Sequence, residues 1–280
     1  MSEPVTTWNQ ILERYDRFKT GQWCFRGDRA RDGEADPDRL PFRTSLERAA
    51  IDRWRREWSE LPRIEAGLLR RFKREAHLYL DHEPAEGDTV GWLALMRHHG
   101  APTRLLDWSF SFFVALYFAI DRADPGESPC VWALNLEKIR EAVEGRDHLR
   151  EHLARDPNAK DAATVRAIID HTPRHALIYP LNPLRMNRRL VLQQSVFIVP
   201  GDITQPFMAN LRAVADPADL LVEIRICTEP TCWTAITREL LAMNISSATL
   251  FPGLDGFASN LKALIPFPDL RAVDTAVGQE

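Results

Sequence analysis

The sequence predicts an α+β fold, in which helices surround a small mixed or antiparallel sheet. Two observations lead to this prediction. Apolar residues recur at helical spacing in several segments, and separate short runs are rich in Val, Ile and Leu. These segments do not alternate in the regular strand–helix order that a doubly wound parallel sheet requires. The 280 residues are 45% hydrophobic and 27% charged, as in an ordinary globular protein.

The composition also excludes some classes of protein. With 36 Lys and Arg against 40 Asp and Glu, the formal net charge is −4, which argues against a generic duplex nucleic-acid binder. No apolar run approaches the roughly 20 residues of a membrane helix, and no secretory signal is visible. The four cysteines form neither a CxxC pair nor a zinc pattern, so we expect reduced, mostly buried thiols in a cytoplasmic protein: Cys24, Cys130, Cys227 and Cys232.

The first elements follow from local spacing. A helical stripe covers residues 8–18, and either Thr6 or Thr7 can cap it. The apolar run at residues 23–25 predicts a buried strand that ends at Arg26-Gly27.

Three helices are expected next, at residues 45–58, 61–80 and 89–98. Ser45 would cap the first of these helices, with Trp54 facing inward. Tyr79 lies on the apolar stripe of the second. Gly100, with Pro102 beyond it, ends the third helix.

The segment 109–121 is so apolar that it should form the central core helix, buried nearly all round. Strands are predicted at 130–134, 190–199 and 221–226, and closing helices at 234–243 and 256–264. The charged stretch at about 136–172 indicates a peripheral helical insertion. We therefore expect a single domain over residues 1–270, followed by a frayed tail at 271–280.

The first polar cluster is Phe25-Arg26-Gly27. An arginine at the end of an apolar strand, followed by glycine, would place a guanidinium at a sheet edge beside open backbone. The planar fork of its donors suits a phosphate or a carboxylate. The alternative is that Arg26 pairs with a carboxylate of the core.

The second cluster is the segment 98–109, which lies next to the most apolar helix. Charged groups in such a place are costly unless they are paired, so Arg104 could pair with Asp107, or Arg26 with Asp107. Asp107 or Ser109 could also cap the following helix, whose N-terminus would attract an anion. The alternative is a polar network that only braces a turn.

The third cluster is Arg188-Arg189 followed by Gln193 and Gln194, which we expect on a strand. Alternate residues of a strand face opposite sides, so at most one of the two amides would face a given pocket. The alternative is plain polarity at a sheet edge. No phosphate-binding loop, hydrolase motif or metal-ligand motif occurs, and adjacent histidines on a helix diverge by about 100°, so no metal site is expected.

Taken together, these segments resemble the FRG-domain family, which is named for its aromatic-Arg-Gly motif. The matching pieces are residues 23–27, 97–109, 114–119, 189–197 and 250–256. The most specific piece is the string PTRLLDW at residues 102–108. The sequence departs from the usual family pattern at Arg97, where glutamine is usual, and at Ser195, where glycine is usual.

The order of these motifs is also similar to that of ADP-ribosyltransferases, which implies a related fold and NAD as the bound nucleotide. By this similarity Arg26 belongs to the first motif, Asp107 to the second and Gln193 to the third, where those enzymes carry a glutamate. The resemblance implies catalytic roles for Asp107, His98 and Gln193. It implies that NAD is bound by a second group of residues: Arg26, Gly27, Arg104 and Ser109.

Three functions stay open at this point. The chain could be an ADP-ribosyltransferase or NAD glycohydrolase, with a protein or nucleic-acid acceptor, and the similarity suggests a toxin or phage-defence role. It could be a non-catalytic nucleotide-binding or regulatory module, which the missing glutamate favours. It could also be a structural or partner-binding protein whose motif only braces the core. We expect no membrane partner.

Overall fold

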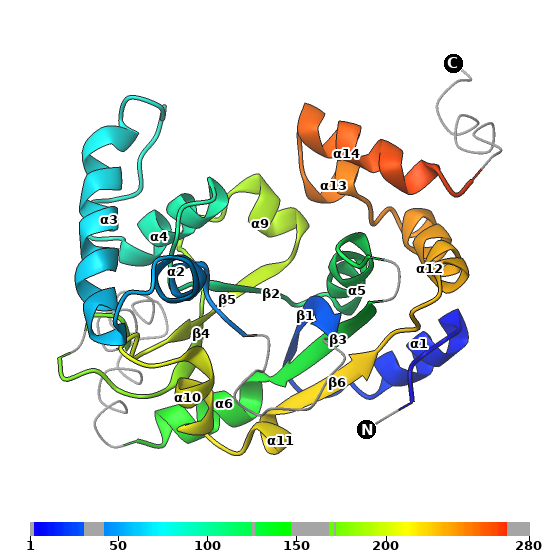
Figure 1. Cartoon of the computed structure of the whole chain (residues 1–280), viewed down its shortest axis with the longest axis horizontal. Coiled ribbons are helices and arrows are strands. Elements are labelled where there is room, and N and C mark those ends of the chain that lie inside the picture. Colours follow the sequence, from blue (N-terminus) through cyan, green and yellow to red (C-terminus); the bar gives the residue numbers. More distant parts are fainter. Residues whose placement is uncertain (1–2, 31–41, 125–126, 147–167, 171, 268–280) are drawn as a thin grey trace.

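A six-stranded antiparallel sheet forms the centre of the protein (Figure 1). The computed structural model describes residues 3–30, 42–124, 127–146, 168–170 and 172–267. The strand order is β4-β5-β2-β1-β3-β6, and every neighbouring pair is antiparallel. The α+β prediction is therefore confirmed. The strands are β1 (Trp23–Ala30), β2 (Leu106–Ser109), β3 (Ser128–Asn135), β4 (Ile178–Leu181), β5 (Ser195–Pro200) and β6 (Leu221–Arg225).

Strand β1 is longer than predicted and lies inside the sheet. It continues through Arg26-Gly27 to Ala30, so the prediction that it ends at this pair, at a sheet edge, is wrong. The strand pairs with β3 along its whole length, but its recorded register with β2 is the single pair Phe25 and Ser109. The residues after Phe25 are too polar to predict a strand, but pairing with β3 supplies their backbone hydrogen bonds. Beyond Phe25, β1 and β2 therefore diverge.

Most predicted helices are present with shifted ends. The helices are α1 (Trp8–Asp16), α2 (Ser45–Glu47), α3 (Leu61–Ala76), α4 (Thr89–His98), α5 (Phe112–Asp121), α6 (Leu136–Glu144), α9 (Arg188–Leu192), α10 (Phe207–Arg212), α11 (Pro217–Leu220), α12 (Pro230–Ala242), α13 (Ser247–Leu250) and α14 (Leu254–Leu264). A π-helix at Arg48–Arg53 and a 3₁₀ turn at Trp58–Glu60 follow α2. Thr7 caps α1, as one of the two predicted alternatives.

Several local predictions are wrong. Thr44, not Ser45, caps the helix that begins at residue 45, and Trp54 is 68% exposed. Tyr79 lies beyond the end of α3 and is 84% exposed. The expected strand 190–199 is the helix α9 and then β5, because the chain reverses at Gln194, whose φ of 46° lies in the left-handed region.

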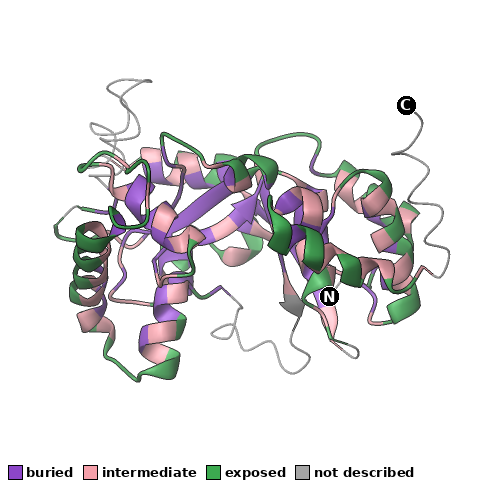
Figure 2. Ribbon diagram, turned by 90° about the horizontal axis from the view of Figure 1, so that it is seen from above, coloured by how far each residue is buried: buried purple, intermediate pink, exposed green. Residues whose placement is uncertain are grey.

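Buried residues concentrate on the two faces of the sheet, and the outer sides of the helices are exposed (Figure 2). Helix α5 lies over β1 and β3 and is buried through most of its length, as predicted for the core helix. It begins at Phe112, however, and Ser111 caps it by accepting a hydrogen bond from the Val114 N–H, so neither Asp107 nor Ser109 is the cap.

The expectation of four reduced cysteines is also wrong. Cys227 and Cys232 form a disulfide, whereas Cys24 and Cys130 are free and buried. Burial raises the pKa of both free thiols.

Some expectations concern residues outside the described part. Of the insertion predicted at about 136–172, residues 147–167 and 171 are not described, nor is the tail 268–280. The single-domain organisation stays a prediction. Among the described residues, no helix has both the length and the apolar character that a membrane crossing demands.

Candidate functional site

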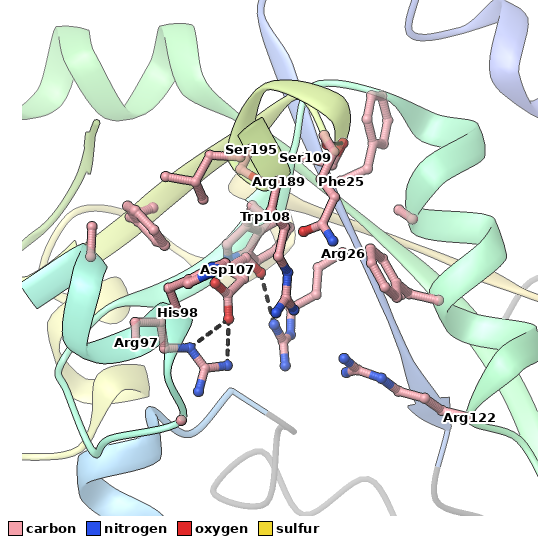
Figure 3. Close-up of a pocket in the computed structure, with 18 residues that line it drawn as sticks. Phe25, Arg26, Arg97, His98, Asp107, Trp108, Ser109, Arg122, Arg189 and Ser195 are labelled. Carbon is pink, nitrogen blue, oxygen red and sulfur yellow. Dashed lines mark hydrogen bonds and ion pairs between the residues drawn. The ribbon is translucent and has the colours of Figure 1, made fainter. Parts of the chain in front are cut away.

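A cavity of about 250 Å³ opens where β1 and β2 diverge. Residues of β1, β2, β5, α4, α5 and α9 line it, together with Arg122 just beyond α5. Figure 3 shows that the guanidinium groups of Arg26, Arg122 and Arg189 point into one space, with Asp107 beside them. Six of the seven sequence-predicted site residues line this one cavity: Arg26, Gly27, His98, Asp107, Ser109 and Gln193.

Arg26 bridges the diverging strands. Its Nη1 donates to the main-chain oxygen of Asp107 at 2.7 Å, and its Nε lies 3.3 Å from a carboxylate oxygen of Asp28. No residue of β1 is paired with Asp107 of β2, so the Arg26 guanidinium donates the hydrogen bond that the Asp107 carbonyl would otherwise accept from a neighbouring strand. Arg26 is thus fixed at the wall of the cavity, with 11% of its side chain exposed.

The Asp107 carboxylate pairs with Arg97, not with Arg104 or Arg26 as predicted. Both the Nε of Arg97, at 2.8 Å, and its Nη2 donate to Oδ2 of Asp107. The other carboxylate oxygen, Oδ1, has no hydrogen-bond partner among the described residues. The Asp107 side chain is 40% exposed and lines the cavity, so a ligand there can contact it.

Two further arginines have no carboxylate partner among the described residues. Arg122 follows α5, and Arg189 lies in the first turn of α9; each instead packs its guanidinium against an aromatic ring. Partial burial is the main cause that lowers the pKa of both side chains; nearby arginines lower it further, while the Asp107 carboxylate opposes the shift in both. Both remain charged at neutral pH because arginine begins from so high a value.

Four arginines therefore line the cavity, and Asp107 is the single carboxylate among its described lining residues. This excess of positive charge suits an anion. The N-terminus of the core helix α5, where an anion site was expected, does not form the wall. The cavity borders the side of α5 instead, through Ala115 and Phe118. Within the described ranges, no group of His, Cys, Asp and Glu is placed to hold a metal ion.

His98 lies at the end of α4 and faces the same cavity. Burial lowers its pKa, and the neighbouring His99 and Arg189 lower it further. The imidazole is therefore neutral at pH 7 and can accept or donate one hydrogen bond.

Ser109 and Gln193 join β2 to the α9–α13 region. The Ser109 hydroxyl donates to the Gln193 main-chain oxygen at 2.7 Å and accepts from the Ser111 N–H. The Gln193 amide nitrogen donates to the Leu250 main-chain oxygen at 3.1 Å. Gln193 is the C-cap of α9 and not a strand residue, so the argument from strand alternation does not apply to it.

Gly27 is needed for packing. A Cβ at this position would lie 2.0 Å from the Ala115 main-chain oxygen and 2.5 Å from the Ala119 nitrogen. The absence of a side chain therefore allows α5 to lie directly on β1, which places Phe118 and Arg122 at the cavity.

Arg104 is the sequence-predicted site residue that does not line the cavity. It is buried and pairs with Glu65 of α3, which accepts from the Arg104 backbone N–H, Nε and Nη2. Each side chain is 6% exposed. Arg104 thus fastens the end of the PTRL segment to α3, 39 positions away in the sequence.

A comparison with protein-family models matches residues 21–128 to the FRG domain. The predicted resemblance to the FRG-domain family is therefore confirmed over this segment. The match includes β1, α4, β2 and α5, and so it supplies Arg26, Arg97, Asp107 and Arg122. Neither the curated proteins nor the solved structures gave a significant match.

Part of the cavity wall comes from outside the matched FRG domain. Arg189, Gln193 and Ser195 line the cavity from α9 and β5. Sequence reasoning identified the Arg188-Arg189 pair as a cluster but missed Arg97 and Arg122 as site residues. Arg97 could have been found from its departure from the family pattern. Arg122 carries no local signal, since it follows an apolar helix as one charged residue among several.

Proposed function

We propose that the cavity binds a phosphate-bearing nucleotide, NAD or a related compound such as ADP-ribose. The observation that carries the proposal is that the described residues around one cavity include four arginines and a single carboxylate, which is itself paired with Arg97. A pyrophosphate offers several acceptor oxygens to such a set, and guanidinium–phosphate contacts are strong and directional. Neutral sugars or peptides would leave this charge uncompensated.

The size of the cavity fits part of such a ligand. At about 250 Å³ it is slightly smaller than the roughly 300–1,000 Å³ of usual small-molecule pockets. We therefore expect it to enclose the pyrophosphate and one ribose of a dinucleotide, while the remaining part extends outward. Arg26 would add a phosphate contact from the cavity wall, and His98 would hydrogen-bond the ligand, more strongly once the imidazole is protonated. Ser109, Gln193 and Gly27 would shape the wall.

Calorimetric titration at fixed salt tests this proposal. ADP-ribose and NAD should bind, whereas adenosine, which has the same base but no phosphate, should bind far more weakly. Arg122→Gln should weaken ADP-ribose binding about ten- to a hundredfold, the value of a charge-assisted hydrogen bond. Arg70→Gln, on the exposed face of α3, is the control and should bind like the wild type. Equal binding of adenosine and ADP-ribose would contradict the proposal.

A second candidate function is cleavage of NAD, as an ADP-ribosyltransferase or a glycohydrolase. It is favoured by one observation: the partly exposed carboxylate of Asp107 lines the same cavity, and its Oδ1 has no hydrogen-bond partner among the described residues. In this reaction the bond between ribose C1′ and the nicotinamide nitrogen breaks, and the electron pair leaves with nicotinamide. Water or a protein or nucleic-acid acceptor then attacks C1′ and loses a proton. A carboxylate near the ribose stabilises the positive charge that develops there.

Release of nicotinamide, followed by chromatography, distinguishes the two candidates. An enzyme should release nicotinamide from NAD, and Asp107→Asn should abolish the release while leaving ADP-ribose binding within a few-fold. A module that only binds should show ADP-ribose binding without any product in the wild type. A structural protein should show neither binding nor turnover.

A further inference from the structure

Two aromatic rings, of which Phe118 lines the cavity, connect the two arginines that lack a carboxylate partner among the described residues. The Arg189 guanidinium lies 4.5 Å from the centre of the Phe251 ring, and that of Arg122 lies 5.3 Å from the centre of the Phe118 ring. The two rings meet edge to face, with 5.9 Å between their centres. The resulting row of four side chains, Arg189–Phe251–Phe118–Arg122, we call the arginine–phenylalanine row.

This row joins segments that are far apart in the sequence. Phe118 and Arg122 belong to the matched FRG domain, whereas Arg189 and Phe251 lie 61 or more positions beyond its end at residue 128. Gln193 fixes the second pair in place, because its amide donates to the main-chain oxygen of Leu250, the neighbour of Phe251. The Ser109 hydroxyl in turn holds the main chain of Gln193. The row is therefore anchored to the central sheet.

Neither charge in the row is neutralised by a direct ion pair among the described residues. Arg26 and Arg97 each have a carboxylate within ion-pair distance, whereas the guanidinium groups of Arg122 and Arg189 lie against rings, and Asp107 acts on both only through space. An aromatic ring orients a guanidinium over its face while leaving the outward N–H donors free. Both side chains line the cavity, and Figure 3 shows both guanidinium groups directed into it.

We propose that Arg122 and Arg189 form the clamp for the ligand's phosphates, and that Phe251 is a positioning residue that aims Arg189 at them. This inference rests on the proposed nucleotide binding. It gives the segment α9–α13 a defined role, since without it the FRG domain would supply only one of the two clamp arginines. Phe118 plays the same part for Arg122, and the contact between the rings couples the two halves.

The test compares ring removal with charge removal, using ADP-ribose as the probe in calorimetry. Arg189→Gln should weaken binding about ten- to a hundredfold. Phe251→Leu should weaken it about two- to fivefold, the value of an exposed cation–π contact. Phe251→Tyr should restore wild-type affinity, because it keeps the ring. Phe251→Met, which has no ring but an adaptable shape, should behave like Phe251→Leu and replaces it if leucine impairs folding.

A double variant separates positioning from a general loss of structure. If Phe251 acts through Arg189, Phe251→Leu should have no further effect in the Arg189→Gln background. Phe257→Leu is the matched control, because Phe257 lies on α14, is 56% exposed and is not part of the row. It should bind like the wild type.

Two results would overturn the inference. Wild-type affinity in both Phe251→Leu and Phe251→Met would remove the positioning role while leaving the proposed nucleotide binding intact. An equal loss from Phe251→Leu in the wild-type and Arg189→Gln backgrounds would show that the ring does not act through Arg189. If the wild type binds neither ADP-ribose nor NAD, the proposed function fails first, and this inference fails with it.

Discussion

Replacing Arg104 by methionine should destabilise the protein severely without changing the cavity. The Glu65 carboxylate accepts three hydrogen bonds, two of them from the Arg104 side chain, and both side chains are 6% exposed. The replacement leaves a buried carboxylate with one backbone N–H as its only remaining donor from residue 104. Breaking a buried pair in this way costs about 3–5 kcal/mol, a large part of the roughly 5–15 kcal/mol by which a domain is stable.

Urea denaturation followed by tryptophan fluorescence measures this loss. Replacing both partners, with Glu65→Leu and Arg104→Met, should recover most of it, because no charge then remains buried. Arg71→Met removes the exposed pair with Glu75 and should cost less than about 1 kcal/mol. A loss below about 1 kcal/mol in Arg104→Met would refute the reasoning, as would a double variant less stable than the single one. Folded Arg104→Met should still bind ADP-ribose normally, since Arg104 does not line the cavity.

Two further predictions concern the cavity itself. Gly27→Ala should lower the free energy of unfolding by about 1–3 kcal/mol and weaken ADP-ribose binding, because the new Cβ would meet the Ala115 backbone and push α5 away. Gly67→Ala, in an open part of α3, should instead stabilise the protein by about 0.5–1 kcal/mol. Thermal melting of both variants checks this prediction. The pKa of His98 is lower in the folded protein, so as the pH falls the unfolded chain takes up the proton first. The contribution of the His98 imidazole to stability is therefore complete above pH 6.5 and is lost as the pH falls through its pKa in the folded state. A bound anion favours the protonated imidazole, so ADP-ribose affinity should rise between pH 7.5 and 5.5 in the wild type but not in His98→Asn, and parallel pH profiles would contradict this role.

Local spacing in the sequence predicted the elements whose residues interact with near neighbours. Helix α1, its threonine cap and the glycine stop after α4 are of this kind. The turn at Gln194 was missed because the run 190–199 is mostly apolar, although Asn187, which caps α9 by accepting from the Leu190 N–H, is a local signal for the start of a helix. Hydrophobic pattern alone does not distinguish these two outcomes for a short apolar run.

The ion pairs show the same limit more sharply. The cost of burying unpaired charges suggested that Asp107 pairs with Arg104 or with Arg26. In the structure Arg104 reaches Glu65 of α3, and Asp107 reaches Arg97 of α4. Alternate residues of an extended segment face opposite ways, so two charges three apart across the start of β2 are directed to different neighbours. The need for partners was predictable from burial, but their identity depended on how the helices pack.

The divergence of β1 from β2 explains why the most specific motifs of the sequence meet at one cavity. Fully paired antiparallel strands leave no space between them, and then Arg26 and Asp107 would lie under helices as ordinary sheet residues. Because the two strands share a single recorded pair, the Arg26 side chain occupies the gap and the cavity opens beside it. The gap persists only if something holds the strands apart, and α5 packed on Gly27 and α9 tied to Ser109 do so from its two sides. The cavity therefore depends on the incomplete pairing of β1 with β2. Variants that disturb the packing of α5 on Gly27 or the hydrogen bond from Ser109 to α9 should weaken ligand binding even where they change none of the arginines.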